Sequence, residues 1–220
     1  LLGQNVNAYN FEGKKLSDLI LEIAKIKKLK RIRYTTSHPR DFTKDLIQVH
    51  KDCDKLMPLI HLPVQSGSNK ILKNMNRKHT IEEYLEIIKK LKYAMPNIEL
   101  SSDFIIGYPG ETEYDFEQTL QLMKKVKFIN SYSFMYSARP GTPAFNLKTI
   151  ENNLTKERLI IFQHLAKKIK TEYRETLLTK TMPVLFENKT QDKNKYFGRD
   201  EHFNSVIVES SENLTGKVRN

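Results

Sequence analysis

Short apolar runs alternate along the chain with longer stretches in which apolar residues recur at helical spacing. Five runs end in small or polar residues, and they begin near Leu1, Ile32, Leu59, Ser101 and Tyr132. The helical spacing fills the intervals between them, at 16–26, 46–49, 81–91 and 116–123. Strands that recur every 30–40 residues or so are typical of βαβ units. The pattern therefore predicts a parallel α/β sheet, which carries its chemistry at the carboxyl ends of the strands.

Two helix starts can be located by their capping residues. Thr80 stands three residues before Glu83, and Thr112 stands three residues before Asp115. In such a capping box each side chain bonds the backbone N–H of the other residue. We therefore expect one helix to begin after Thr80 and end near Pro96, and another to begin after Thr112.

The last third of the chain has a different pattern of apolar and polar residues. A long charged helix is expected from Leu154 to about Thr179, and short strand-like runs separated by polar turns follow it. We place a domain boundary near Leu178. Residues 1–178 are expected to form a partial parallel (β/α) barrel, because a complete barrel takes about 250 residues. Residues 179–220 are expected to form a small, incomplete β-barrel.

Composition narrows the class of protein. The chain of 220 residues is 39% hydrophobic and 29% charged, and no apolar run approaches the ~20 residues that cross a bilayer. Its one cysteine excludes a disulfide framework and fits a reducing cytoplasm. The net charge of +11 has two explanations, a lysine-rich composition or a polyanionic partner such as RNA. The strand-rich tail favours the second.

Polar side chains at the first two strand ends are candidate ligand contacts. Gln4 and Asn5 carry amides that can donate and accept hydrogen bonds at once, although an Asx-type turn would explain them equally. Ser37 and His38 precede Pro39. No nucleophile or orienting carboxylate accompanies His38, so we expect it to contact substrate rather than to act as a general base.

The remaining strand ends offer further candidates. Gln65 and Ser66 lie in a Ser-Gly-Ser turn that suits an anion or a ribose hydroxyl, or that simply caps a helix. Asp103 ends a strand, where it either accepts from a ligand or caps a turn. Arg139 stands in a rigid turn suited to a carboxylate or phosphate. We interpret His61 as a satisfied core histidine, and Cys53, between two aspartates, as an incidental thiol.

Taken together, these strand-end motifs closely resemble those of the radical S-adenosylmethionine methylthiotransferases. The motifs that carry the resemblance are Leu1-Leu2-Gly3-Gln4-Asn5-Val6-Asn7, Thr35-Thr36-Ser37-His38-Pro39, His61-Leu62-Pro63-Val64-Gln65-Ser66-Gly67-Ser68, Ser101 to Gly107 with Pro109-Gly110-Glu111-Thr112, and Ser137-Ala138-Arg139-Pro140-Gly141-Thr142. The resemblance continues into a small RNA-binding β-barrel of the TRAM type. It therefore covers essentially the whole chain.

The resemblance implies a reaction and its cofactors. Enzymes of this family use S-adenosyl-L-methionine and two [4Fe-4S] clusters. They form a 5′-deoxyadenosyl radical and place a methylthio group on an adenine carbon. The first and last motifs are similar to those of the branch that acts on a prenylated adenosine beside the tRNA anticodon. The implied partners are tRNA and an electron donor such as a flavodoxin or ferredoxin, and a cytoplasmic monomer without a membrane is expected.

The resemblance also implies roles for individual residues. Gln65 and Ser66 match the strand that contacts the cofactor ribose, and Asp103, Ile105 and Gly107 match the strand that contacts its adenine. Gln4 and Asn5 belong to the same cofactor-binding set. Ser37, His38 and Arg139 are the candidate substrate contacts, and Arg139 alternatively faces the second cluster.

The sequence departs from the family in its cysteines. The Cys-x-x-x-Cys-x-x-Cys loop of the radical cluster and three further cysteines are absent, and Cys53 matches neither set. The chain also starts without methionine inside an expected strand, so we expect a fragment that is catalytically inactive alone. Two alternatives stay open: a clusterless RNA-binding relative, and a sister methylthiotransferase that acts on a ribosomal protein.

Overall fold

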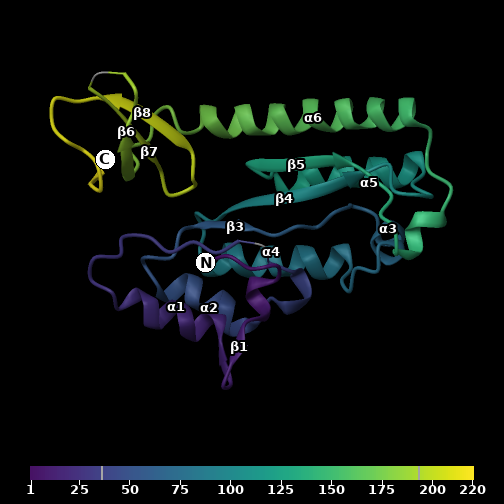
Figure 1. Cartoon of the computed structure of the whole chain (residues 1–220), viewed down its shortest axis with the longest axis horizontal. Helices are drawn as coiled ribbons and strands as arrows, with labels where there is room; N and C mark the ends of the chain where they lie inside the picture. The colour runs from purple at the N-terminus through teal and green to yellow at the C-terminus, as the bar shows by residue number, and fades with distance from the viewer. Residues whose placement is uncertain (36, 193) are drawn as a thin grey trace.

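The centre of the molecule is a parallel sheet of three strands. The computed structural model describes residues 1–35, 37–192 and 194–220. Strands β3 (Leu59–His61), β4 (Glu99–Ile106) and β5 (Asn130–Met135) pair in the order β3-β4-β5 (Figure 1). Each connection between them contains helix, as parallel pairing requires. The predicted parallel α/β class is confirmed.

The described part of the chain contains six α-helices, which leave one face of this sheet uncovered (Figure 1). They are α1 (Leu16–Ala24), α2 (Lys44–Asp52), α3 (Asn69–Asn74), α4 (Ile81–Ala94), α5 (Glu113–Val126) and α6 (Asn152–Glu175). The capping boxes predicted at Thr80 and Thr112 are both present, with Glu83 and Asp115 as the returning side chains. Short 3₁₀ helices lie at Val6–Ala8, Pro39–Asp41 and Pro143–Asn146.

The prediction of strands at Leu1 and Ile32 is wrong in its detail. Within the described part of the chain, Ile32 makes a single parallel bridge, to Leu56. The pairing there does not extend into a longer ladder among the described residues. The N–H of Ile32 donates to the carbonyl of Lys55, and the N–H of Met57 donates to the carbonyl of Ile32. Beyond this bridge, Arg33 and Thr35 bond Leu1. A short hairpin of β1 (Asn10–Phe11) and β2 (Lys14–Lys15) was not anticipated.

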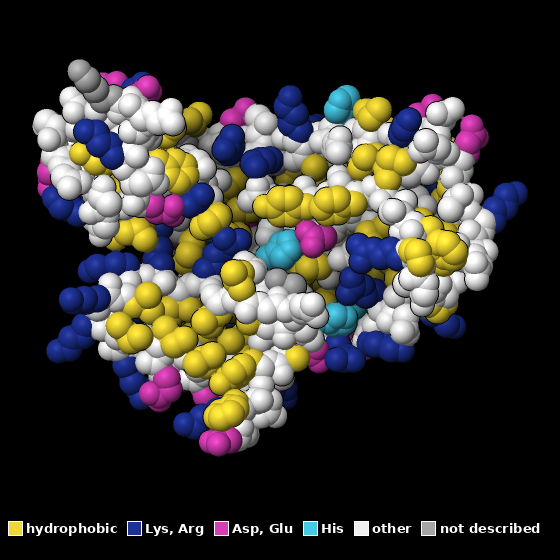
Figure 2. Space-filling view, in the orientation of Figure 1, with side chains coloured by type: hydrophobic (Ala, Val, Ile, Leu, Met, Phe, Trp, Pro, Cys, Tyr) yellow, Lys and Arg dark blue, Asp and Glu magenta, His cyan; other side chains and the backbone are white. Residues whose placement is uncertain are grey.

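The two faces of β4 differ in burial. Phe104 and Ile106 point into the core, which the helices cover, and Phe104 stacks 4.8 Å from Phe162 of α6. Asp103 and Ile105 alternate with them and are half-buried on the opposite face. In Figure 2 that face shows hydrophobic side chains along its middle, with His and acidic side chains beside them. Helices therefore cover only one face of the sheet, and the other face is open to a ligand.

An antiparallel sheet forms the C-terminal part. Its strands β6 (Val184–Lys189), β7 (Lys195–Arg199), β8 (Ser205–Glu209) and β9 (Val218–Arg219) pair in the order β8-β7-β6-β9. A small core of its own contains Val184, Phe186, Tyr196 and Leu214. The domain boundary proposed near Leu178 lies in the connection between α6 and β6.

The C-terminal part packs against the amino-terminal side of the parallel strands. Arg31, just before the bridged Ile32, donates to the carbonyl oxygens of Pro183, Arg199 and Asp200 at 2.7, 2.6 and 3.0 Å. The His202 ring lies 2.9 Å from the carbonyl oxygen of Asn97, which precedes β4. The carboxyl ends of the strands, at the opposite side, are left free.

Candidate functional site

A pocket opens at the carboxyl ends of β4 and β5. Its volume is about 640 Å³, within the roughly 300–1,000 Å³ of small-molecule sites. Four residues singled out in the sequence line it: Gln65, Asp103, Ile105 and Arg139. Its walls are thus both polar and apolar, as binding of a nucleoside requires.

Gln65 is fixed to the strand beside it by an unusual backbone. Its N–H donates to the carbonyl oxygen of Asp103, and its own carbonyl accepts from Ile105, each at 2.9 Å. Its φ is +78°, and such a conformation costs a non-glycine residue about 1–3 kcal/mol. The amide side chain lines the pocket and has no hydrogen-bond partner among the described residues.

Asp103 is paired with a histidine on the open face. Its Oδ2 lies 3.3 Å from Nε2 of His61, whose Nδ1 is 3.0 Å from the hydroxyl of Ser101. His61 is therefore satisfied by protein partners, as expected, but it lies at the open face rather than deep in the core. Tyr132 packs edge-on against the ring of His61. This arrangement holds one carboxylate oxygen of Asp103 and leaves the other for a ligand.

Arg139 is exposed in a turn that closes the far wall of the pocket. Its carbonyl oxygen accepts from the Thr142 hydroxyl at 2.8 Å, and the Tyr136 hydroxyl donates to the carbonyl of Ala144. The guanidinium has no hydrogen-bond partner among the described residues. It is free to pair with an anionic ligand.

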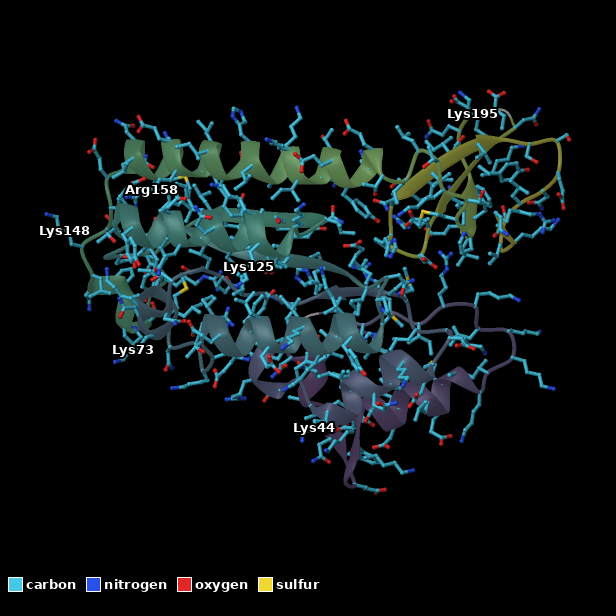
Figure 3. All side chains as sticks on the ribbon, turned by 180° about the vertical axis from the view of Figure 1, so that it is seen from behind. Lys44, Lys73, Lys125, Lys148, Arg158 and Lys195 are labelled. Carbon is cyan, nitrogen blue, oxygen red and sulfur yellow. The ribbon has the colours of Figure 1, made fainter. Side chains whose placement is uncertain are left out.

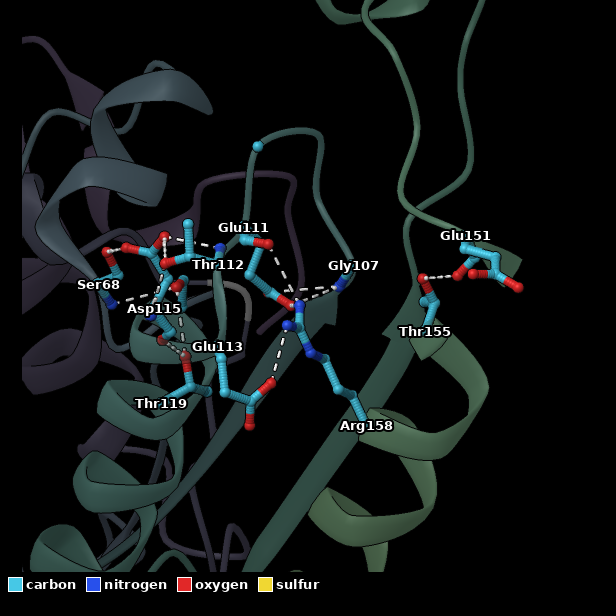
Figure 4. Close-up of polar contacts among 12 residues, drawn as sticks. Ser68, Gly107, Glu111, Thr112, Glu113, Asp115, Thr119, Glu151, Thr155 and Arg158 are labelled. Carbon is cyan, nitrogen blue, oxygen red and sulfur yellow. Dashed lines mark hydrogen bonds and ion pairs between the residues drawn. The ribbon is translucent and has the colours of Figure 1, made fainter. Parts of the chain in front are cut away.

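Ser66 and Gly107 make their hydrogen bonds within the protein, next to residues that line the pocket. Ser66 is buried, accepts from the N–H of Ser68, and lies 3.4 Å from the hydroxyl of Thr119. Gly107 donates its N–H to Glu111, which pairs with Arg158 of α6 (Figure 4). Ser68 caps α3, the helix that the Ser-Gly-Ser turn was expected to open. In this structure both residues make contacts within the protein.

The other sequence candidates lie outside the pocket lining. Asn5 donates to Asp41 at 2.6 Å, and the N–H of His38 donates to Asn7 at 2.8 Å. Ser37 is buried, and its hydroxyl has no partner among the described residues. Gln4 is exposed. The structure groups Asn5 and His38 in one loop cluster, but it does not place them on the wall formed by Asp103.

Sequence reasoning missed several residues that line the pocket. These are Arg77, Tyr108, Phe134 and Tyr136. The rings of Tyr108 and Tyr136 stack edge-on at 5.0 Å, and Phe134 is 58% exposed. The alternation of Tyr132 and Phe134 in β5 with Tyr136 directly after it was a usable signal, because residues two apart share one face of a strand. Arg77 had no such signal.

Charge is distributed over much of the molecule. Lys44, Lys73, Lys148 and Lys195, which come from different elements, point outward in Figure 3.

Among the described residues no group of three or more His, Cys, Asp or Glu side chains could hold a metal ion. No helix in the described part is long and apolar enough to cross a membrane. Cys53, expected to be an incidental thiol, is 5% exposed and belongs to the main core.

Curated relatives match nearly the whole chain. The chain is 56% identical over 222 aligned residues to a tRNA-2-methylthio-N(6)-dimethylallyladenosine synthase of Pelagibacter ubique, covering 99% of this chain and 50% of the relative. A protein of the same name from Wolbachia pipientis wMel is 52% identical over 96% of this chain and 50% of its own length. The chain spans about half the length of the curated relatives it matches.

The fold and a family model agree with these matches. Coproporphyrinogen III oxidase (HemN) from Escherichia coli superposes with a TM-score of 0.57 at 13% identity, covering 84% of this chain and 51% of that one. That likeness concerns the fold alone. The model of the Radical SAM superfamily matches residues 2–123, more than half of the chain. With its strand-end pocket and open sheet face, the chain belongs to the radical SAM superfamily.

Proposed function

We propose that this chain is the barrel part of a tRNA methylthiotransferase that modifies a prenylated adenosine beside the anticodon. The observation that carries the proposal is the strand-end pocket, in which Gln65, Asp103 and Ile105 meet as the family resemblance implies. The names of the relatives at 52–56% identity support the same substrate class.

The residues present fit S-adenosyl-L-methionine. Ile105 and Phe134 offer apolar contact for an adenine ring, and Gln65 and Asp103 offer hydrogen bonds for ribose hydroxyls. The free amide of Gln65 is consistent with a ligand contact, because Gln65 is buried and buried polar groups normally find partners. When bound, the cofactor would supply the adenosyl radical and the methyl group. The role of this chain is to bind and orient it over the open face of the sheet.

The residues present do not fit an iron–sulfur cluster. Such clusters are held by cysteine thiolates, and this chain has one cysteine, buried in the core. The chain alone therefore does not hold either [4Fe-4S] cluster by the ligands of the family, and we propose that it is inactive alone. Anaerobic reconstitution with iron and sulfide tests this point, since stoichiometric cluster absorbance on this chain would contradict it.

We propose that the C-terminal sheet is a TRAM-like RNA-binding module for the same tRNA. Its four antiparallel strands with a separate small core support the assignment. The net charge of +11 favours a polyanion. Binding carried by Lys and Arg contacts to phosphate should weaken steeply with salt. Affinity for tRNA that is equal at low and high salt would contradict this role.

The activity is tested on the gene product of full length. A bacterial strain that lacks its own enzyme is complemented with the gene, and the nucleosides of its tRNA are measured by mass spectrometry. The 2-methylthio form of the prenylated adenosine is expected to appear. Its absence together with a methylthiolated ribosomal protein would favour the sister enzyme. RNA binding without either product would favour the clusterless relative.

We propose further that the protein acts as a cytoplasmic monomer and receives electrons from a flavodoxin or ferredoxin. The lack of a helix that could cross a membrane, among the described residues, is compatible with this. Gel filtration and activity with each purified donor test the two statements.

A further inference from the structure

Arg33 lies at the junction between the barrel part and the C-terminal sheet. It directly follows Ile32, which forms the parallel bridge to Leu56. Its guanidinium carbon is 3.9 Å from the ring centroid of Phe203, in the turn between β7 and β8. The guanidinium carbon of Arg199, the last residue of β7, is 4.4 Å from the same centroid. Two guanidinium groups, one from each part of the protein, therefore meet at one aromatic ring.

The turn that carries Phe203 is fixed by hydrogen bonds to Asp200. One oxygen of the Asp200 carboxylate accepts from the N–H of His202 at 2.9 Å and from the N–H of Asn204 at 2.8 Å. The N–H of Phe203 donates to the Asp200 carbonyl at 3.2 Å. Phe203 itself has φ +66°, a left-handed conformation that is unfavourable for a residue with a side chain. The turn therefore holds the ring at the junction without help from a ligand.

The guanidinium of Arg33 is half-buried and has no acidic partner in the part of the chain that the structure describes. It makes no side-chain hydrogen bond or ion pair there, whereas Arg199 pairs with Glu187. Burial lowers the pKa of Arg33, Tyr132 opposes this shift, and the positive charge of Arg199 adds to it. Two like charges at one ring, one of them without a counter-ion, are costly until an anion joins them.

Further positive charge surrounds this place. Lys27, Lys28 and Lys30 in the segment before Arg33 are exposed, and none of them has an ion pair among residues 1–35, 37–192 and 194–220. Figure 2 shows Lys and Arg side chains gathered along the boundary between the C-terminal sheet and the rest of the chain. Such a concentration of one sign of charge attracts a polyanion.

The open face of the parallel sheet connects Arg33 with the strand-end pocket. Tyr132 of β5, whose charge acts on Arg33, is exposed and lies opposite Asp103 in the strand register. Phe134, two residues further along β5, is exposed too and lines the pocket. Exposed aromatic rings on a sheet, next to basic side chains, are typical of surfaces that bind single-stranded nucleic acid.

We propose that Arg33, Arg199 and Phe203 form a junction clamp that holds a backbone phosphate of an RNA strand lying along the open face. The planar fork of Arg33 suits bidentate pairing with a phosphate, and Phe203 keeps the guanidinium in place. Because each part of the protein supplies one arginine, the RNA is held by the barrel and the C-terminal sheet together. The inference rests on the proposed function, to which it adds an RNA contact outside the C-terminal sheet.

A salt series of binding measurements on this chain tests the proposal. The probes are an anticodon stem-loop RNA and poly-L-glutamate, which offers carboxylates in place of phosphates and represents an acidic protein surface. The variants are Arg33→Gln, Arg33→Lys and Phe203→Leu. Lys44→Gln is the matched control, because it removes one positive charge from α2, where Lys44 points outward and away from the C-terminal sheet (Figure 3). Amide exchange in β6 and β7 reports whether the junction stays closed in each variant.

Arg33→Gln should weaken RNA binding by about tenfold, as expected for the loss of one charged hydrogen-bonding group. The slope of log affinity against log salt should fall by about one phosphate contact. Arg33→Lys and Phe203→Leu keep the charges, so they should weaken binding less and leave this slope unchanged. Lys44→Gln should match wild type. Amide exchange in β6 and β7 should be unchanged in Arg33→Gln, because Arg31 still bonds the C-terminal part.

Three outcomes overturn the proposal. The first is salt-dependent RNA binding that is equal in wild type, Arg33→Gln and Arg33→Lys. The second is weaker binding of Arg33→Gln with an unchanged salt slope and faster exchange in β6 and β7, which would make Arg33 a fastener of the junction only. The third is an effect of Arg33→Gln on poly-L-glutamate but not on RNA, which would assign the surface to an acidic protein.

Failure of the wild-type chain to bind the RNA is a different result. It would contradict the proposed RNA-binding role of the C-terminal sheet together with the inference. If Arg33→Gln does not fold, Arg33→Lys and Phe203→Leu still test the clamp, because RNA affinities equal to wild type in both would contradict it.

Discussion

Nη1 of Arg158 on α6 lies 2.9 Å from Oε1 of Glu111 in the loop after β4, and both side chains are almost fully buried. Glu111 in turn accepts from the N–H of Gly107 at the strand end (Figure 4). Burial raises the pKa of Glu111, and the Arg158 guanidinium opposes this shift. One ion pair thus joins α6 to the backbone that forms one wall of the pocket.

Removal of one partner of this pair should destabilise the fold strongly. Arg158→Leu leaves the Glu111 carboxylate buried without its cation, and such a change costs about 3–5 kcal/mol. The double change Arg158→Leu with Glu111→Leu should recover much of the loss, because no buried charge is left unpaired. Urea unfolding measures both values. The control is Lys168→Leu, in an exposed pair with Glu172, where less than about 1 kcal/mol is expected. Equal losses of unfolding free energy in Arg158→Leu and Lys168→Leu would contradict the role of the buried pair.

Asp115 should make stability fall at acidic pH. Burial raises the pKa of its carboxyl, but hydrogen bonds from Lys70, Thr112 and Ser68 outweigh burial and hold the pKa well below its usual value. A carboxyl with a lowered pKa in the fold stabilises it above the unfolded pKa, near 3.8. That stability is lost as the pH falls through the folded pKa. Unfolding free energies of wild type and Asp115→Asn should therefore differ most at pH 7 and converge below about pH 4.

A control for this pH effect is Glu117→Gln on the exposed side of α5. Its unfolding free energy should follow the wild-type curve, since surface changes of this kind are usually within about 0.5 kcal/mol. A wild-type curve parallel to that of Asp115→Asn from pH 7 to 3 would argue against the stabilising role of the Asp115 carboxylate.

Two glycines of one turn should tolerate alanine differently. Gly107 and Gly110 both have positive φ, +78° and +81°, so alanine is strained at either position by about 1–2 kcal/mol. A Cβ on Gly107 would also lie 2.3 Å from Cγ2 of Thr155, whereas a Cβ on Gly110 meets nothing within 4 Å. Gly107→Ala should therefore lose about 1–3 kcal/mol more than Gly110→Ala. Thermal unfolding measures the difference, and Gly107→Ala combined with Thr155→Ala should recover part of it.

Local patterns predicted the parts of this fold that depend on neighbours in sequence. The capping boxes at Thr80 and Thr112 are confirmed because both partners lie within four residues. The strand expected at Ile32 is reduced to one bridge, with Leu56, and Arg33 and Thr35 after it bond Leu1. Strand pairing depends on a distant segment, so the apolar run alone could not show it.

In the candidate site, too, residues marked by a local pattern could be predicted, and a residue placed by distant contacts could not. Gln65, Asp103 and Arg139 could be predicted because each stands at a strand end or in a rigid turn, and the fold brings strand ends together. Arg77 could not, because it lies in a charged connector whose sequence resembles many exposed ones. The left-handed turn at Asn76 places Arg77 at the pocket, where its guanidinium has no hydrogen-bond partner among the described residues.

Arg31 should hold the C-terminal sheet to the barrel. It donates to three carbonyl oxygens of the C-terminal part, and burial lowers its pKa, so the guanidinium is taken from water at this junction. Arg31→Ala leaves these acceptors without their donor, at a cost of about 1–3 kcal/mol. Amide exchange in β6 and β7 should become faster while exchange in β4 is unchanged, because the C-terminal sheet loses its attachment to the barrel but β4 keeps its contacts within the main core.

Lys30→Ala, at the exposed neighbouring residue, is the matched control and should change neither exchange rate. Faster exchange in β4 and β6 alike would mean that the two parts unfold as one unit, and Arg31 would then stabilise the whole chain rather than the junction.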